Sequence, residues 1–211
     1  MFTKTLLPDT IRVIKLVSSL QIVKDSYLAG GTALALQIGH RISIDLDFFT
    51  RQEFDENVLS TELSQLPEFK KEGQAWRTVW GKLGKTKFSL FYYEYPLIAP
   101  TKKFEGIKIA SKEDIAAMKI QAIADRGTKR DFIDLYFLSK DYTLDEMLKF
   151  YDQKYGNLEE KLYHLVRSLS YFADAEMDKI PKILKNVDWD KIKNFFQNES
   201  LRLSRSRFGV K

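Results

Sequence analysis

Two acidic residues separated by a single position, Asp45 and Asp47, are the strongest candidates for chemistry in this chain of 211 residues. Apolar Ile44 and Leu46 alternate with them, and this period of two predicts a half-buried strand over residues 42–49. Alternate residues of a strand share one face of a sheet, so both carboxylates are expected to point to the same side. Mg²⁺ prefers oxygen ligands and often contacts the phosphates of a substrate as well. The pair therefore predicts a site for Mg²⁺ and for phosphoryl transfer.

A diglycine precedes these acids in the chain. Gly30 and Gly31 lie at the start of a predicted helix, with Thr32 placed to cap its first turn. Glycines let backbone N–H groups approach a phosphate closely, and the N-terminal end of the helix dipole favours an anion. Arg41 shares the side of Asp45 if the strand begins early enough, and its forked guanidinium would bind a triphosphate. Each feature alone is also typical of a turn, a cap or a surface charge, so the prediction of a nucleotide site depends on their combination.

The composition limits the other kinds of chemistry. Because there is no cysteine and there are only two histidines, disulfides, thiolate nucleophiles and cysteine zinc sites are excluded, and a metal must be held mainly by carboxylates. The N-terminal segment carries Asp9 and Arg12 where a signal peptide needs apolar residues, and no apolar run is long enough to span a membrane. We therefore expect a cytoplasmic protein with no membrane partner. The net charge of +5 is compatible with a nucleic-acid partner but does not by itself indicate one.

The elements that must position these residues form a mixed front half and a helical back half. Their residue patterns predict strands over 42–49, 75–79, 87–93 and 106–109. They predict helices over 9–24, 32–39, 55–66, 114–126, 130–139, 144–155, 158–172 and 189–202. The predicted fold class is α+β, with a mixed β-sheet and flanking helices in residues 1–110. Residues 111–211 are expected to form a C-terminal helical bundle packed on that core.

Three short sequence blocks follow one another along the chain. They are Gly30-Gly31-Thr32, then Arg41-x-Ser43-x-Asp45-x-Asp47-Phe48-Phe49, and finally Lys119 followed by Arg126-Gly127-x-x-Arg130-Asp131-Phe132-x-Asp134-Leu135. Over about residues 25 to 140 these blocks resemble the motifs of the AbiEii/AbiGii toxin family. That family belongs to the DNA polymerase beta-like nucleotidyltransferase superfamily. The three blocks in this order are much more specific than any one of them alone.

The resemblance implies an activity and a set of site residues. It implies a nucleotidyltransferase-like fold in which Asp45 and Asp47 hold Mg²⁺ while a nucleotide is transferred from a nucleoside triphosphate to an acceptor. In characterised relatives the acceptor is RNA, notably the tRNA 3′ end, and the resemblance implies such an acceptor here. It also implies a possible cognate antitoxin protein, as in toxin–antitoxin or phage-defence systems. The implied nucleotide-binding residues come from all three blocks: Gly30, Gly31, Thr32, Arg41, Ser43, Lys119, Arg126 and Arg130. The implied catalytic residues are Asp45, Asp47, Lys119, Asp131 and Asp134.

The residue patterns also support other interpretations. Without the resemblance, the helical spacing of Lys119, Asp131 and Asp134 favours a surface lattice of ion pairs. The third strand carboxylate of polymerase-type enzymes has no clear counterpart, because residues 87–95 offer only Glu94. The alternative of a catalytically inactive RNA- or protein-binding module of the same fold therefore remains. A haloacid dehalogenase-like phosphatase is a weaker alternative, since Phe49 stands where that family needs threonine.

Two surface features are compatible with a nucleic-acid partner. Aromatic residues are frequent between Phe88 and Tyr95. This pattern is more typical of a strand packed in the core than of a surface that stacks with nucleobases. Lys82, Lys85 and Lys87 would follow an RNA backbone, although such charge runs are usually only solvated.

Overall fold

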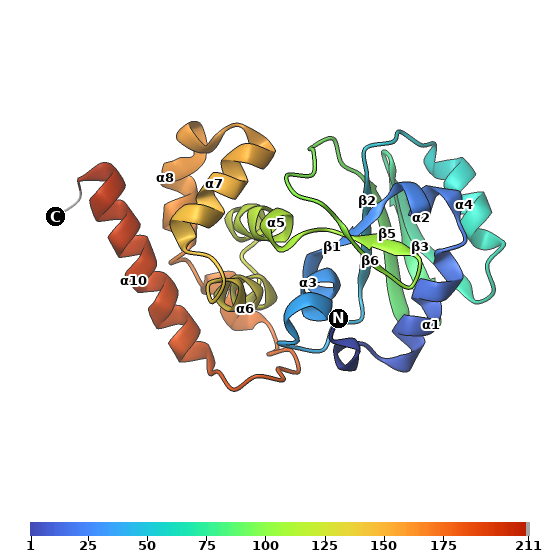
Figure 1. Cartoon of the computed structure of the whole chain (residues 1–211), viewed down its shortest axis with the longest axis horizontal. Helices are drawn as coiled ribbons and strands as arrows, with labels where there is room; N and C mark the ends of the chain where they lie inside the picture. The colour runs from blue at the N-terminus through green and yellow to red at the C-terminus, as the bar shows by residue number, and fades with distance from the viewer. Residues whose placement is uncertain (210–211) are drawn as a thin grey trace. The chain divides into compact units, whose positions relative to one another are not determined.

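The computed structural model describes residues 1–209, and its internal contacts divide the chain into one unit of Met1–Ser111 and a second that begins at Lys112 (Figure 1). The first unit contains a seven-stranded sheet, and the second contains α5 to α10. The predicted α+β class, a mixed sheet with flanking helices followed by a helical region, is therefore confirmed. None of the helices in the described residues is long and apolar enough to cross a membrane.

The sheet is mixed because its central strand β2 pairs with two neighbours in opposite senses. The strands are β1 (Tyr27–Ala29), β2 (Leu46–Thr50), β3 (Phe69–Ala75), β4 (Thr78–Leu83), β5 (Thr86–Tyr92), β6 (Lys102–Phe104) and β7 (Ile107–Ile109), in the spatial order β3-β4-β5-β2-β1-β7-β6. Strand β2 runs antiparallel to β1 and parallel to β5. Its residues alternate between buried and half-buried, as the period of two predicts.

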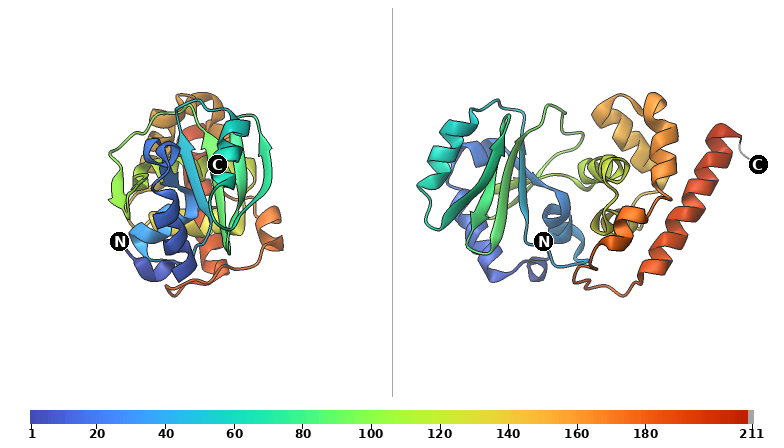
Figure 2. Two further views of the ribbon diagram at one scale, coloured as in Figure 1. Left: turned by 90° about the vertical axis from the view of Figure 1, so that its right-hand side faces the viewer. Right: turned by 180° about the vertical axis from the view of Figure 1, so that it is seen from behind.

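Helices α1 (Pro8–Val17) and α4 (Glu56–Ser64) lie on one side of the sheet, and α3 (Gly30–Ile38) lies on the other side (Figures 1 and 2). The core beneath α1 and α4 is built from alternate strand residues. Leu46 and Phe48 of β2 are fully buried there beside Phe88 and Leu90 of β5. The other side chains of β2 and β5, including Asp47, therefore face the side of the sheet that carries α3.

Several elements differ from the prediction for local reasons. The strand predicted over 75–79 is the turn of a hairpin, since Ala75 ends β3 and Thr78 begins β4. The helix predicted over 158–172 ends at Ser168. The single helix predicted over 9–24 is broken, because the hydroxyls of Ser18 and Ser19 donate to carbonyls of the preceding turn; the chain resumes as α2 (Gln21–Asp25). Strand β2 begins at Leu46 rather than at residue 42, since the N–H of Ser43 donates to the carbonyl of Thr5. Strand β3 was not predicted, because it is a largely exposed edge strand with an irregular register after Lys71.

The second unit is built around aromatic packing. Its helices are α5 (Lys112–Asp125), α6 (Lys129–Leu138), α7 (Leu144–Tyr155), α8 (Leu158–Ser168), α9 (Ala173–Met177) and α10 (Trp189–Phe208). The ring of Phe132 on α6 lies 5.0 Å from that of Phe172 and 5.3 Å from that of Phe196 on α10. These contacts fix α6, which carries Asp131 and Asp134.

Candidate active site

The turn between β1 and α3 brings the diglycine next to the acidic pair. Gly30 has a φ of +67°, a left-handed conformation that favours glycine, and it is the first residue of α3. A Cβ atom placed on Gly30 would lie 3.4 Å from the Oδ2 atom of Asp47. The carboxylate of Asp47 therefore lies directly over the turn at the start of α3.

Gly31 leaves room for the side chain of Arg41. A Cβ atom on Gly31 would lie only 1.9 Å from Nη2 of Arg41, so any larger residue must displace the guanidinium. Arg41 is 3% exposed, and its Nη1 donates to the carbonyl of Ile42 at 3.2 Å. The forked cation is thus already positioned at the helix N-terminus, where both the dipole and the guanidinium favour an anion.

Thr32 acts differently from the prediction that it caps α3. The helix begins at Gly30, and Ala29 stands at the N-cap without a side-chain hydrogen bond. The Thr32 hydroxyl instead donates to the carbonyl of Asp45 at 2.5 Å and lies 2.9 Å from Oγ of Ser43. Thr32 and Ser43 are both buried, so these contacts tie the helix to the segment that carries the acids.

Asp45 and Asp47 come from different local structure. Asp47 is the second residue of β2, paired with Ala29 on β1 and with Ser89 on β5, whereas Asp45 directly precedes the strand. Both side chains are half-buried, which leaves them accessible to a ligand. Two carboxylates separated by one residue in the chain would offer Mg²⁺ hard oxygen ligands, with water or phosphate completing the shell.

A third protein carboxylate is not part of this site. The position beside Asp47 on β5 is Ser89, and Glu94 lies beyond Tyr92, where β5 ends. In the described residues there is also no group of three or more acidic, histidine or cysteine side chains arranged to hold a metal. The metal site predicted at Asp45 and Asp47 therefore stays a prediction with two protein carboxylates.

The third sequence block forms a second cluster, within α5, α6 and the loop between them. Nζ of Lys119 lies 2.8 Å from Oδ1 of Asp131 and 2.6 Å from Oδ2 of Asp134. The three side chains are 7%, 1% and 0% exposed, so the surface lattice suggested by spacing alone is wrong. Arg126 reaches the same carboxylate of Asp131 at 3.1 Å, but its own side chain is 65% exposed.

Asp131 is held ionised by its neighbours. Burial alone would raise the pKa of Asp131, but the charges of Lys119 and Arg126 outweigh burial and lower it to about 2. The Thr128 hydroxyl also donates to this carboxylate, at 2.6 Å. Arg130, the other predicted phosphate contact of this block, is exposed on α6. The cluster thus presents arginine charge at the surface and anchors it on a buried carboxylate.

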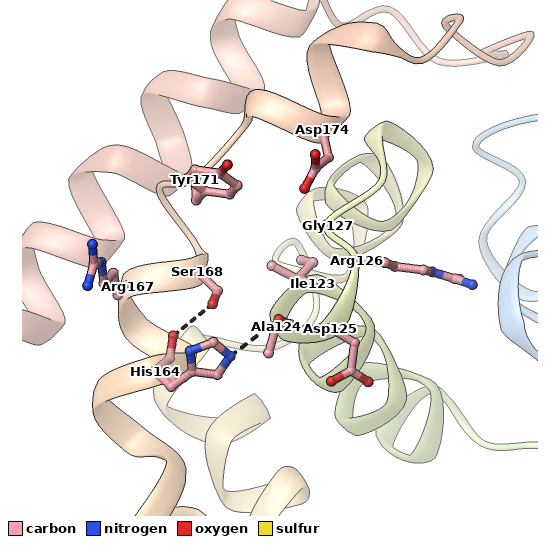
Figure 3. A pocket seen from close by; sticks show the side chains of 10 residues that line it. All are labelled: Ile123, Ala124, Asp125, Arg126, Gly127, His164, Arg167, Ser168, Tyr171 and Asp174. Carbon is pink, nitrogen blue, oxygen red and sulfur yellow. Dashed lines mark hydrogen bonds between the residues drawn. The ribbon is translucent and has the colours of Figure 1, made fainter.

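A pocket of about 400 Å³ lies beside this loop, between Arg126-Gly127 and helix α8 (Figure 3). The guanidinium groups of Arg126 and Arg167 point away from it in opposite directions. His164 is exposed, and its Nε2 lies 3.3 Å from the carbonyl of Ala124. The charge of Arg126 is therefore directed outward and not into this pocket.

Comparison with known proteins agrees with the motifs. A family described as nucleotidyl transferase AbiEii toxin, type IV TA system, matches residues 22–203. This chain belongs to the AbiEii family. Its enzyme class, a nucleotidyltransferase, is thereby confirmed, and the phosphatase alternative is not supported.

Relatives extend over most of the chain. An uncharacterised protein of Aquifex aeolicus is 40% identical over 191 residues, which cover 87% of this chain and 90% of that protein. The nucleotidyltransferase toxin MenT4 of Mycobacterium tuberculosis has a similar fold, with 15% identity, a TM-score of 0.61 and coverage of 93% of this chain and 81% of that one. A putative nucleotidyltransferase of Helicobacter pylori gives 21% identity, a TM-score of 0.53 and coverage of 96% and 95%. These structures support the fold.

Proposed function

We infer that this AbiEii-family enzyme transfers a nucleotide from a nucleoside triphosphate to RNA, at the 3′ end of tRNA, and that it acts as the toxin of a system with a cognate antitoxin. The observation that carries this proposal is the arrangement at the start of α3. One turn brings together a helix N-terminus, the buried guanidinium of Arg41 and the carboxylate of Asp47. Cationic and anionic groups side by side are what a metal-bound triphosphate requires.

In this proposal the residues of the first unit have different roles. Arg41 and the backbone at Gly30 and Gly31 bind the triphosphate, while Thr32 and Ser43 hold the acidic segment against α3. Asp45 and Asp47 would hold Mg²⁺, which when bound neutralises phosphate charge and stabilises the oxygens of an in-line displacement.

The second unit carries a positively charged cluster of its own. Lys119 and the arginines Arg126 and Arg130 contribute cations, and the buried carboxylates of Asp131 and Asp134 hold Lys119 in place. Because the pKa of Asp131 is about 2, this carboxylate stays ionised near neutral pH and is a poor proton acceptor. We therefore assign Asp131 a positioning role, through Lys119 and Arg126.

Transfer of label from a nucleoside triphosphate tests the proposal directly. Purified protein is incubated with Mg²⁺, total tRNA and each of the four α-labelled nucleoside triphosphates in turn, and the RNA is separated on a denaturing gel. We expect label on tRNA with wild-type protein and none with Asp47→Asn, because the variant lacks one metal-ligand charge. If no triphosphate labels any RNA, the proposed function is wrong.

A further inference from the structure

The register of the sheet aligns particular side chains on the face that carries Asp47. Asp47 on β2 lies opposite Ser89 on β5, and Ser89 lies opposite Trp80 on β4. One step along, Phe49 lies opposite Phe91. The alternate residues of these strands are buried on the other face of the sheet, whereas these five side chains are half-buried. They are therefore not part of the core beneath α1 and α4.

Aromatic rings cover this face beside the acidic site. The rings of Phe49 and Phe91 are stacked, with centroids 5.2 Å apart and an interplanar angle of 26°. The ring of Tyr93 meets Phe49 edge-on at the same distance. The indole of Trp80 lies against the backbone of β3, since a Cβ atom on Gly73 would be 2.3 Å from its Cζ2 atom. Flat, partly exposed rings of this kind are suited to stacking with nucleobases.

Lysines border the rings on the same face. Lys82 and Lys87 lie directly opposite each other on β4 and β5, and Lys70 lies opposite Lys82 on β3. Like charges directly opposite on neighbouring strands destabilise a sheet. Lys82 pairs with Glu72, which offsets only one of the three positive charges. The row therefore retains a net positive charge that a polyanion would compensate.

We propose that this face, defined by Phe49, Trp80, Lys82, Lys87 and Phe91, binds the single-stranded end of the acceptor RNA. The proposal rests on the proposed function, since it places the acceptor beside Asp47. The lysines contact backbone phosphates, and Trp80 and Phe91 stack with bases. Rows of cations next to partly exposed rings fit a single strand better than a duplex, whose bases are already stacked.

Binding of a short RNA, measured without Mg²⁺ or nucleoside triphosphate, tests this surface separately from catalysis. The probe is a fluorescein-labelled oligouridylate of about 12 nucleotides, and the readout is anisotropy over a series of salt concentrations. For K82A/K87A we expect weaker binding and a slope of log K against log salt that is reduced by about 1.4, or about 0.7 for each lost phosphate contact. The matched control is K103A/K108A, which removes two lysines that also face each other on neighbouring strands, β6 and β7. This control should retain the wild-type slope.

A second pair of variants tests the rings. Trp80→Ala should weaken binding about 5-fold or more, while Trp80→Phe retains most of the affinity because a stacking ring remains. Trp76→Ala, at the tip of the same hairpin, should bind as wild type. The surface lysine variants keep the test decisive if Trp80→Ala folds poorly.

The outcomes separate this proposal from the proposed function. Asp45→Asn should bind the oligouridylate as well as wild type while losing nucleotide transfer. A loss of nucleotide transfer alone therefore does not contradict the proposed RNA-binding face. The RNA-binding face is refuted if wild-type protein does not bind the oligouridylate, if it prefers a blunt duplex, or if both lysine pairs change the salt slope equally. It is also refuted if K82A/K87A labels tRNA as fast as wild type at limiting RNA.

Discussion

The buried cluster around Asp131 makes stability depend on pH in a way that one substitution should reveal. The pKa of Asp131 is about 2 in the folded protein, compared with 3.8 for an unperturbed carboxyl group, although burial opposes this lowering. The ionised form is therefore favoured by folding, and its contribution is fully present above the unfolded pKa. As the pH falls from about 4 towards 2, this contribution is lost.

The magnitude follows from the two pKa values. A difference of nearly two pKa units corresponds to about 2 kcal/mol of folding free energy near neutral pH. At pH 3 roughly half of that contribution remains, because the folded carboxylate is still ionised while the unfolded one is mostly protonated. Asp131→Asn removes this titration. We therefore expect its destabilisation to be about 1 kcal/mol smaller at pH 3 than at pH 6.

Urea unfolding, followed by far-ultraviolet circular dichroism at pH 6, 4 and 3, measures this difference. The control is Asp125→Asn, an exposed residue of α5 that is hydrogen-bonded to Gln121. The cost of this variant in the free energy of unfolding at each pH is the reference with which the cost of Asp131→Asn is compared. If the cost of Asp131→Asn is the same at pH 6 and pH 3, then Lys119 and Arg126 do not stabilise the ionised carboxylate, and the explanation of the cluster is wrong.

Three further predictions concern the candidate residues of the two units, and a fourth variant serves as a control. Asp47→Asn should abolish Mg²⁺-dependent nucleotide transfer, as measured by labelling of RNA. Thermal unfolding without metal should give an unchanged or higher melting temperature. Retained nucleotide transfer would contradict the metal site. Gly31→Ala should displace the guanidinium of Arg41, so it should weaken triphosphate binding as much as Arg41→Ala does. The double variant should bind no more weakly than either single variant, because both changes remove the same contact. Titration with a non-hydrolysable triphosphate measures these affinities. Lys119→Ala should reduce turnover about 10²- to 10³-fold and also cost about 3–5 kcal/mol of stability, because it leaves two buried carboxylates without their shared cation. Lys112→Ala, which breaks a partly exposed ion pair, should cost less than about 1 kcal/mol and leave turnover unchanged.

Local sequence patterns predicted the parts of the fold whose signals are local. The alternation around Asp47 identified β2, and Asp55 was correctly expected at the start of α4, where its side chain accepts from the N–H groups of Asn57 and Val58. Strand β3 escaped prediction because most of its residues are polar and exposed, so no apolar period marks it. The start of β2 was placed too early, because the partner of the Ser43 N–H is distant in sequence.

In the candidate site, too, local patterns identified residues, whereas contacts between distant segments could not be predicted. Residue types and spacing singled out Gly31, Arg41 and Asp47, but they could not show that Arg41 occupies the space beside Gly31. Nor could helical spacing distinguish an exposed lysine from the buried Lys119, because burial depends on how α5 and α6 pack. Ser89 gave no signal at all, since its place beside Asp47 depends on the pairing of β2 with β5.

The residues around Asp47 indicate why acids and aromatics can share one face of this sheet. The immediate neighbours of Asp47 are small: Ala29 lies on one side, Ser89 on the other, and Gly30 over the carboxylate. Larger side chains at these positions would fill the space that a metal and phosphates require. Two residues further along β2, the neighbours of Phe49 are large and aromatic. The change from small to aromatic neighbours marks, on our proposals, the step from the part of the face that binds phosphates to the part that stacks bases. Ser89 lies between Lys87 and Phe91 on β5 and opposite Trp80. A bulky substitution of Ser89 should therefore impair both triphosphate binding and RNA binding.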